Sequence, residues 1–271
     1  MNVLAVRNGR TNKTIITEDF FLKTAVAKDE TRRTRLSRER WALALARTRG
    51  LPVPDVLEYA VRGNEEILKL ERINAPNLTF YNVDVQSRIL KRVGIDFSSK
   101  LKNISDRFGW PDEEKFLGTY ATWKEFLSEF IERYGRRIVE KKIIPPVFLE
   151  TVLAAVSEMQ FYKNGADLIH RDIKEENILY LPESDQYWIV DWENALLGDG
   201  LFDLATYSGD YGRTSLWMAL ADGFGKENIK SRQYLLYEAA ALIGTIDFYR
   251  KQNIESSFRI RSLDAIVKKL I

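Results

Sequence analysis

The chain changes character at Ala75-Pro76, and this change limits the folds open to it. Before it, short apolar runs predict five strands, over residues 3–6, 14–17, 20–25, 56–61 and 67–73. One helix is expected between the third and fourth strands, with Asp29 as its N-cap and Gly50 and Pro52 at its end. After residue 76, amphipathic stretches over 84–106, 122–140 and 146–163 predict long helices. We expect a sheet lobe, residues 1–74, and a larger helical lobe, residues 75–271, with a hinge between them.

The composition is that of a globular protein that folds on its own. Hydrophobic residues make up 45% of the 271 positions and charged residues 30%. Cysteine is absent, which excludes disulfides, thiolate catalysis and zinc–thiolate sites. The N-terminus lacks the apolar segment of a signal peptide, and no uncharged apolar run approaches the ~20 residues that cross a bilayer. We therefore expect a cytoplasmic protein with no membrane partner.

One short segment gathers polar residues that can do chemistry. Residues 168–179 read Leu-Ile-His-Arg-Asp-Ile-Lys-Glu-Glu-Asn-Ile-Leu and contain His170, the only histidine, with Asp172 and Asn177. Asp191 ends the apolar run Trp-Ile-Val nineteen residues after Asp172. The apolar stretches 178–181 and 187–190 flank the turn 182–185, so they predict a hairpin. Such a hairpin would place Asn177 beside Asp191.

These residue types match the needs of phosphoryl transfer. The reaction requires a clamp on the phosphates, a metal that bridges them, and a carboxylate that orients the acceptor hydroxyl. Asp172 would accept the proton of the hydroxyl, and Asn177 and Asp191 would hold Mg²⁺ through hard oxygen ligands. Lys23, on the third strand, would contact the phosphates of ATP or GTP, and Glu39, on the following helix, would pair with Lys23.

The order of these motifs resembles the aminoglycoside phosphotransferase and choline kinase superfamily, small-molecule relatives of the protein kinases. The resemblance covers nearly the whole chain. It rests on Phe-Leu-Lys23, Arg-Glu39-Arg-Trp, Leu-Pro-Val-Pro54, Leu-Glu71-Arg-Ile, Ala-Thr-Trp123-Lys-Glu-Phe-Leu, the loop at 168–179, Val-Asp191-Trp-Glu193 and Gly-Asp199-Gly-Leu-Phe-Asp203-Leu-Ala. It implies an α+β, bilobal, protein-kinase-like fold, with a small N-terminal antiparallel sheet lobe carrying one helix and a larger, mainly helical C-terminal lobe.

The resemblance also implies roles for further residues. Asp203 would lie buried under the catalytic loop and accept backbone hydrogen bonds, and His170 would support that loop rather than react. The segment from Leu70 to Asn74, which includes Glu71, Arg72 and Ile73, would recognise the nucleotide base. The loop departs from the usual small-molecule form at Arg171, where glycine is common, and at Lys174, where protein kinases place a phosphate-contacting lysine. We count Lys174 with Asp172 as catalytic.

Two segments are candidates for binding a nucleotide or a nucleic acid. The segment Asn8 to Lys13 has one glycine, so its role as a phosphate-covering loop is only weakly signalled. The basic run of Arg32, Arg33, Arg35, Arg38 and Arg40 lies on the expected helix with acids nearby, which favours a solvated face over nucleic-acid binding. We expect no nucleic-acid partner.

The acceptor is the least determined part of the prediction. Gly198, Asp199 and Asp203 follow Asp191 closely and leave little room for a peptide-docking loop, which favours a small acceptor. An aminoglycoside or amino sugar leads, because acids such as Glu193 and Asp210 would suit a cation. Choline, ethanolamine or a sugar, a protein Ser/Thr kinase, and a nucleotide-binding regulator without turnover stay open. The oligomeric state is not indicated by the sequence.

Seven aromatic residues in the second half of the chain have two possible uses. They could form a cage around a quaternary ammonium group, or they could pack in the hydrophobic core, which is the expected use for most of them. These residues are Trp192, Tyr207, Tyr211, Trp217, Tyr237, Phe248 and Tyr249.

Overall fold

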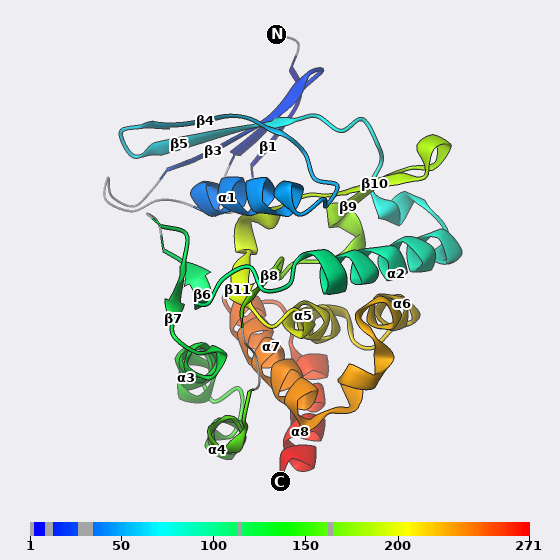
Figure 1. Ribbon diagram of the computed structural model, residues 1–271. Helices are drawn as coiled ribbons and strands as arrows, with labels where there is room; N and C mark the ends of the chain where they lie inside the picture. The colour runs from blue at the N-terminus through cyan, green and yellow to red at the C-terminus, as the bar shows by residue number, and fades with distance from the viewer. Residues whose placement is uncertain (1–2, 9–12, 27–34, 113–114, 162–164) are drawn as a thin grey trace.

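The N-terminal part of the chain is an antiparallel sheet flanked by one helix (Figure 1). The computed structural model describes residues 3–8, 13–26, 35–112, 115–161 and 165–271. Five strands pair in the order β1-β2-β3-β5-β4. They are β1 (Val3–Asn8), β2 (Lys13–Thr17), β3 (Phe20–Val26), β4 (Val56–Arg62) and β5 (Glu65–Glu71), and helix α1 spans Arg35–Thr48. The strands and the helix agree with the sequence prediction, while the N-cap expected at Asp29 lies outside the described residues.

The sequence periods of β5 and α1 explain how this sheet and helix face each other. Every second residue of β5 is buried, from Glu66 to Leu70, as expected for a strand with one covered face. In α1, Leu36, Glu39 and Leu43 are buried at spacings of three and four, so they share one face of the helix. That face packs against β3 and β5, which brings the carboxylate of Glu39 toward the sheet.

The rest of the chain is mainly helical. The helices are α2 (Val83–Lys100), α3 (Trp123–Glu140), α4 (Pro146–Glu158), α5 (Leu201–Tyr211), α6 (Ser215–Phe224), α7 (Arg232–Arg250) and α8 (Ser257–Leu270). Short 3₁₀ turns lie at Leu78–Phe80, Glu175–Asn177, Pro182–Ser184, Trp192–Asn194 and Lys226–Lys230. Helix α3 begins at a capping box in which Thr122 and Glu125 bond each other's backbone N–H groups. Helices α2 and α4 end at Lys100 and Glu158, several residues before the ends predicted from the sequence.

Two small sheets lie between the N-terminal sheet and the helices. The predicted hairpin is present as β9 (Ile178–Leu181) and β10 (Gln186–Ile189), with Ile178 opposite Ile189. A second sheet, in the order β7-β6-β11-β8, was not predicted. Its strands are β6 (Phe108–Pro111), β7 (Gly118–Tyr120), β8 (Asp167–Ile169) and β11 (Leu196–Gly198). Strand β8 leads directly into the loop at His170, and β11 leads into α5, so this sheet positions both ends of the candidate site.

Aromatic packing explains the glycine at the end of β11. Trp123 at the start of α3 is fully buried and contacts Phe126, Phe202 and Tyr237. A Cβ added to Gly198 would overlap the Trp123 ring, so only glycine fits there. The motif that begins at Gly198 is thus explained in part by packing.

The architecture confirms the predicted fold class, an α+β fold in which an antiparallel sheet with one helix precedes a larger helical part (Figure 1). The lobe boundary at residue 74 falls in the segment between β5 and the first 3₁₀ turn and stays a prediction. Within the described ranges, no helix combines the length and the apolar character needed to cross a membrane.

Candidate active site

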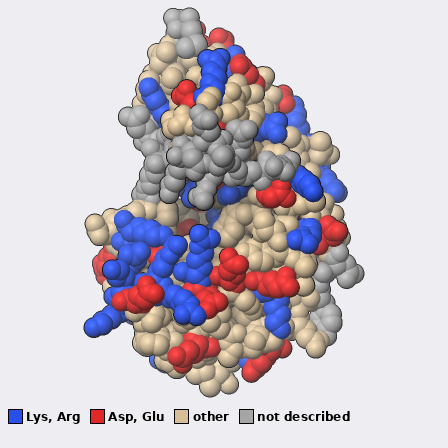
Figure 2. Space-filling model, turned by 90° about the vertical axis from the view of Figure 1, so that its left-hand side faces the viewer, with Lys and Arg blue, Asp and Glu red and all other residues tan. Residues whose placement is uncertain are grey.

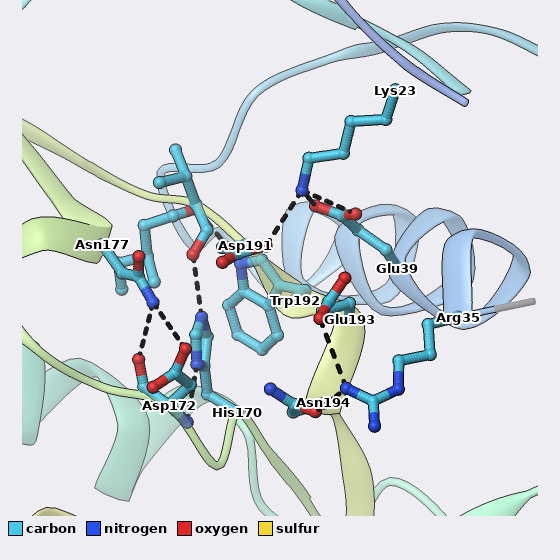
Figure 3. A network of polar contacts seen from close by, with 12 residues as sticks. Lys23, Arg35, Glu39, His170, Asp172, Asn177, Asp191, Trp192, Glu193 and Asn194 are labelled. Carbon is cyan, nitrogen blue, oxygen red and sulfur yellow. Dashed lines mark hydrogen bonds and ion pairs between the residues drawn. The ribbon is translucent and has the colours of Figure 1, made fainter. Parts of the chain in front are cut away.

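Lys23 joins three elements at the upper side of the site. It lies on β3, and its Nζ atom is 2.7 and 2.9 Å from the two carboxylate oxygens of Glu39 on α1 and 2.9 Å from Oδ1 of Asp191 (Figure 3). The Glu39 side chain is fully buried, and the Lys23 side chain is 12% exposed. Burial acts to lower the pKa of Lys23, but Glu39 and Asp191 outweigh it, so the pKa is raised. The ammonium is held charged and pointed at Asp191.

Asp172 occupies the centre of the loop between β8 and β9. Lys174 donates to both of its carboxylate oxygens, at 3.0 and 2.9 Å, and the Asn177 side-chain amide donates to its Oδ2 and its backbone carbonyl, at 3.0 and 2.9 Å. Burial raises the pKa of Asp172, against the opposing effect of Lys174 and Asn177. The carboxylate is therefore fixed in orientation and more basic than an exposed aspartate.

Asn177 and Asp191 offer oxygen atoms suited to a hard cation. The Asn177 amide nitrogen bonds to Asp172, which leaves its amide oxygen for a ligand, and Asp191 uses Oδ1 for Lys23. The backbone N–H of Val190 donates to the backbone carbonyl of Asn177 at 3.0 Å. Asn177 therefore lies beside Asp191, the residue that follows Val190. No group of three or more His, Asp or Glu side chains in the described residues could hold a metal alone. Mg²⁺ is commonly held by one or two protein ligands together with substrate phosphates, and this pair fits that chemistry.

His170 holds the loop and the Asp191 segment together. Its ring is fully buried beside Trp192, at 4.5 Å between ring centroids. Nδ1 accepts the Asp172 N–H at 3.2 Å, so Nε2 carries the proton and donates to the Val190 carbonyl at 3.0 Å. Burial lowers the pKa of His170 to about 4, although the bond to Val190 opposes this effect. The ring is neutral at pH 7 and faces the backbone rather than the cavity.

This environment predicts a pH dependence of stability. The pKa of His170 is about 4 in the folded chain and near 6.5 in the unfolded chain. Between pH 4 and pH 6.5, therefore, the histidine binds a proton in the unfolded chain but not in the folded chain. The contribution of His170 to the free energy of unfolding is complete above pH ~6.5 and is lost as the pH falls toward 4. The stability difference between wild type and His170→Gln should therefore shrink by about 2 kcal/mol from pH 7 to pH 5. Urea unfolding at both pH values measures it; a difference that is the same at both would contradict the tautomer and its burial.

Asp203 supports the loop from below. It lies on α5, is 1% exposed, and accepts the backbone N–H groups of His170, at 3.0 Å, and Arg171, at 2.5 Å. Burial raises the pKa of Asp203 to about 7, against the two amide donors. These two bonds fix the path of the chain directly before Asp172.

Arg171 has an unfavourable backbone conformation at this point. Its φ angle is 64°, a left-handed value that costs a non-glycine residue about 1–2 kcal/mol. The guanidinium carbon lies 5.5 Å from the Trp110 ring centroid and 5.4 Å from that of Phe130. Its Nε atom is buried without a hydrogen-bond partner. The family resemblance leads us to expect glycine at this position, and the sequence alone does not explain why this chain has arginine.

A single cavity of about 1010 Å³ connects these groups. On the sheet side its lining includes the apolar side chains of Ile16, Phe21, Leu70 and Ile73, together with Thr14, Lys23 and Glu71. Of the predicted base-binding segment, Leu70, Glu71 and Ile73 line the cavity, whereas Arg72 and Asn74 do not. The Arg72 side chain donates to the Glu18 carbonyl at 3.1 Å. Of the predicted phosphate-covering loop, residues 9–12 lie outside the described residues.

On the helical side the cavity is bounded by the loop between β8 and β9, by α3 and α5, and by the end of α7. Of the seven aromatic residues considered as a cage, four are buried in the core and three line this side: Tyr211, Phe248 and Tyr249. Glu193 also lines the cavity and is paired with Arg35 at 3.3 Å, and Arg35 bonds Asn194 at 3.0 Å (Figure 3). Sequence reasoning missed the link from Arg35 to Glu193, because residues 158 positions apart carry no local signal.

Comparisons with known proteins agree with this geometry. A model of the phosphotransferase enzyme family matches residues 148–242, the part that contains the loop around Asp172 as well as Asp191 and Asp203. The resemblance seen in the sequence is confirmed. A search of curated proteins finds no match.

Solved structures of small-molecule kinases share the fold over nearly the whole chain. A thermostable mutant of aminoglycoside phosphotransferase APH(4)-Ia has 15% identity and a TM-score of 0.76, covering 99% of this chain and 94% of that one. Choline kinase LicA from Streptococcus pneumoniae has 16% identity and a TM-score of 0.64, with 99% and 95% covered. Another structure of the APH(4)-Ia mutant is a ternary complex with AMP-PNP and hygromycin B, with 15% identity, a TM-score of 0.74, and 98% and 94% covered.

Proposed function

We propose that this protein is a phosphotransferase that moves the γ-phosphate of ATP or GTP to a hydroxyl group of a small molecule. The observation that carries the proposal is the bonded series Glu39–Lys23–Asp191 on one wall of the cavity, with Asp172 and Asn177 on the same cavity. The match to the phosphotransferase enzyme family over residues 148–242, which include Asp172, Asn177 and Asp191, supports it.

Each residue has a role that follows from its contacts. Lys23, held by Glu39, contacts the nucleotide phosphates, and Asp172 orients the acceptor hydroxyl and accepts its proton. Lys174, within 3.0 Å of Asp172, adds positive charge where the phosphate is transferred. Asn177 and Asp191 would hold Mg²⁺, which neutralises phosphate charge when bound. His170 and Asp203 keep the loop in place.

The path of the chain after Asp191 favours a small acceptor. Strand β11 and helix α5 follow within ten residues, so a long peptide-docking segment has no place there. The sequence favours an aminoglycoside or amino sugar, and a related structure is a complex with hygromycin B. Choline, ethanolamine and neutral sugars belong to the same set of candidate acceptors.

The test is a screen for nucleotide consumption. The purified chain is incubated with ATP or GTP, Mg²⁺ and each of a panel of aminoglycosides, amino alcohols and sugars, and phosphate transfer is followed with labelled nucleotide. We expect transfer to at least one small acceptor. Thermal stabilisation by nucleotide without transfer to any compound would favour a nucleotide-binding regulator. Label on a protein substrate, with small alcohols inert, would favour a protein kinase.

A further inference from the structure

The helical side of the cavity, where we expect the acceptor to bind, has a wall of aromatic and cationic side chains. On α3, Phe130, Arg133, Tyr134 and Arg137 follow at spacings of three and four, so they share one face of the helix. The first three of these line the cavity. Opposite them, α7 presents the small residues Ala241, Gly244 and Thr245 at the same spacing. A Cβ added to Gly244 would lie 2.8 Å from the Phe130 ring, so the small residues let α7 pack closely against the rings of α3.

Arg171 extends this wall to the catalytic loop. Its guanidinium lies against the rings of Trp110 and Phe130 and lines the cavity one residue before Asp172. Arg171 makes no ion pair with a described carboxylate, although the charges of Asp203 and Asp172 act on its guanidinium, and its Nε atom is buried without a hydrogen-bond partner. A residue that keeps a left-handed backbone where glycine would be unstrained indicates that its side chain is used.

The acids near this wall do not neutralise it. Asp247, at the end of α7, is 1% exposed and is shared by Arg137, Arg250 and Lys251, at 3.4, 3.1 and 2.5 Å. Three cations around one carboxylate leave a net positive charge. Rings connect the wall, because Phe130 lies 4.6 Å from Tyr134 and Tyr134 lies beneath both Arg137 and Lys251, with ring centroids 5.4 and 6.0 Å from their charged groups.

The carboxylates of Glu176 and Asp210 also line the cavity, and the charges of Asp210 and Arg171 act on each other. Glu176 is exposed at the edge of the cavity, and burial together with the charge of Asp172 raises the pKa of Asp210 to about 6. Arg133 is exposed and makes no hydrogen bond or ion pair with another described residue. Figure 2 shows Lys and Arg side chains gathered, with Asp and Glu side chains among them, on the face of the molecule that carries α3 and β7, below the residues drawn in grey.

We propose that the acceptor carries an anionic group, a carboxylate or a phosphate, in addition to the hydroxyl that is phosphorylated. Arg171 binds this group beside Asp172, and Arg133 and the Asp247 cluster (Asp247, Arg137, Arg250 and Lys251) attract it from the wall of α3 and α7. This inference rests on the proposed phosphotransferase function and replaces the cationic acceptor favoured by the sequence. The rings of Trp110, Phe130 and Tyr134 provide the surface on which a sugar or similar carbon skeleton packs.

The first experiment compares acceptors that share a carbon skeleton and differ in the charge of one substituent. The set is glucose, glucosamine, glucuronate and glucose 6-phosphate, with a second set of glycerol, serinol and glycerate. With ATP or GTP and Mg²⁺, we expect kcat/KM to be at least ~10-fold higher for an anionic member than for its neutral and amine counterparts, because a charge-assisted hydrogen bond is lost without the anion. The carboxylate and phosphate members distinguish the two sources of charge.

The second experiment removes the cations. Arg171→Gly fits the left-handed backbone without strain, and Arg133→Gln is on an exposed position, so both variants should fold. Each should raise KM for the anionic acceptor roughly 10-fold and change KM for a neutral acceptor by less than about 2-fold. Arg136→Gln is the matched control, since Arg136 lies on α3 outside the cavity and pairs only with Glu132 among the described residues.

The outcomes separate this inference from the function beneath it. Faster transfer to glucosamine or an aminoglycoside, with KM unchanged in Arg133→Gln and Arg171→Gly, would overturn the anionic acceptor and leave the phosphotransferase in place. Nucleotide binding with no transfer to any acceptor in either set or in the wider screen would overturn both. Equal effects of Arg133→Gln and Arg136→Gln would show that general surface charge, and not this wall, sets the affinity.

Discussion

Asp172→Asn is expected to lower kcat by about 10²–10⁴-fold while the chain keeps its fold and its affinity for nucleotide. The substitution nearly conserves shape, and the new amide oxygen can still accept the hydrogen bonds of Lys174 or Asn177. It cannot accept the proton of the acceptor hydroxyl. Because Asp172 makes no hydrogen bond to Lys23 or Glu39, the bonded series Glu39–Lys23–Asp191 stays intact. Rapid-quench measurement of phosphate transfer at saturating nucleotide isolates the loss in the chemical step.

A matched acid elsewhere on the chain provides the control for this prediction. Asp84 is exposed in the first turn of α2, does not line the cavity, and should give wild-type kcat when replaced by Asn. Nucleotide-induced thermal stabilisation should be the same in wild type, Asp172→Asn and Asp84→Asn. Full activity in Asp172→Asn would remove Asp172 from the chemistry and with it the proposed function. Loss of nucleotide-induced stabilisation in the same variant would assign Asp172 to binding instead.

The local features of this fold could be predicted from the sequence because each has a local cause. The period of β5, the capping box of α3 and the turn between β9 and β10 are all encoded within a few neighbouring residues. The hairpin then places Asn177 beside Asp191 by register alone, so two distant polar residues could be predicted as neighbours. The ion pair of Lys23 and Glu39 was expected from the order of strand and helix.

Features that depend on distant pairing could not be predicted in the same way. The strands β6, β7, β8 and β11 are three or four residues long, too short for a periodic signal, and their order mixes segments up to 90 residues apart. The aromatic and cationic wall on the helical side of the cavity also depends on residues that are distant in the sequence. Trp110, Phe130 and Arg171 come from a strand, a helix and a loop, and only the fold shows that they meet. Glu193 and Asp210 follow the Asp191 motif closely in the sequence, so they could be proposed as partners for a cationic acceptor. The three cations around Asp247 come partly from another helix, so the sequence did not show them as one group.

Lys23→Met should reduce both stability and nucleotide binding. Glu39 is fully buried, and its two carboxylate oxygens accept hydrogen bonds from Lys23. Breaking a buried ion pair by removing one partner leaves an uncompensated charge and costs about 3–5 kcal/mol. Urea unfolding should therefore show a loss of this size, and added nucleotide should no longer raise the melting temperature. Lys69→Met is the matched control, because Lys69 lies on the neighbouring strand β5 outside the cavity.

The double variant Lys23→Met/Glu39→Leu separates the two effects. Replacing both members of a buried pair by apolar side chains removes the unpaired charge, so most of the lost stability should return. Phosphate transfer should not return, because the ammonium that contacts the phosphates is still missing. Recovery of stability without recovery of transfer would assign the lysine to the nucleotide and the glutamate to holding that lysine. Normal nucleotide affinity in Lys23→Met would instead make the pair a structural link between β3 and α1 and would leave the phosphates without the clamp that the proposed function requires.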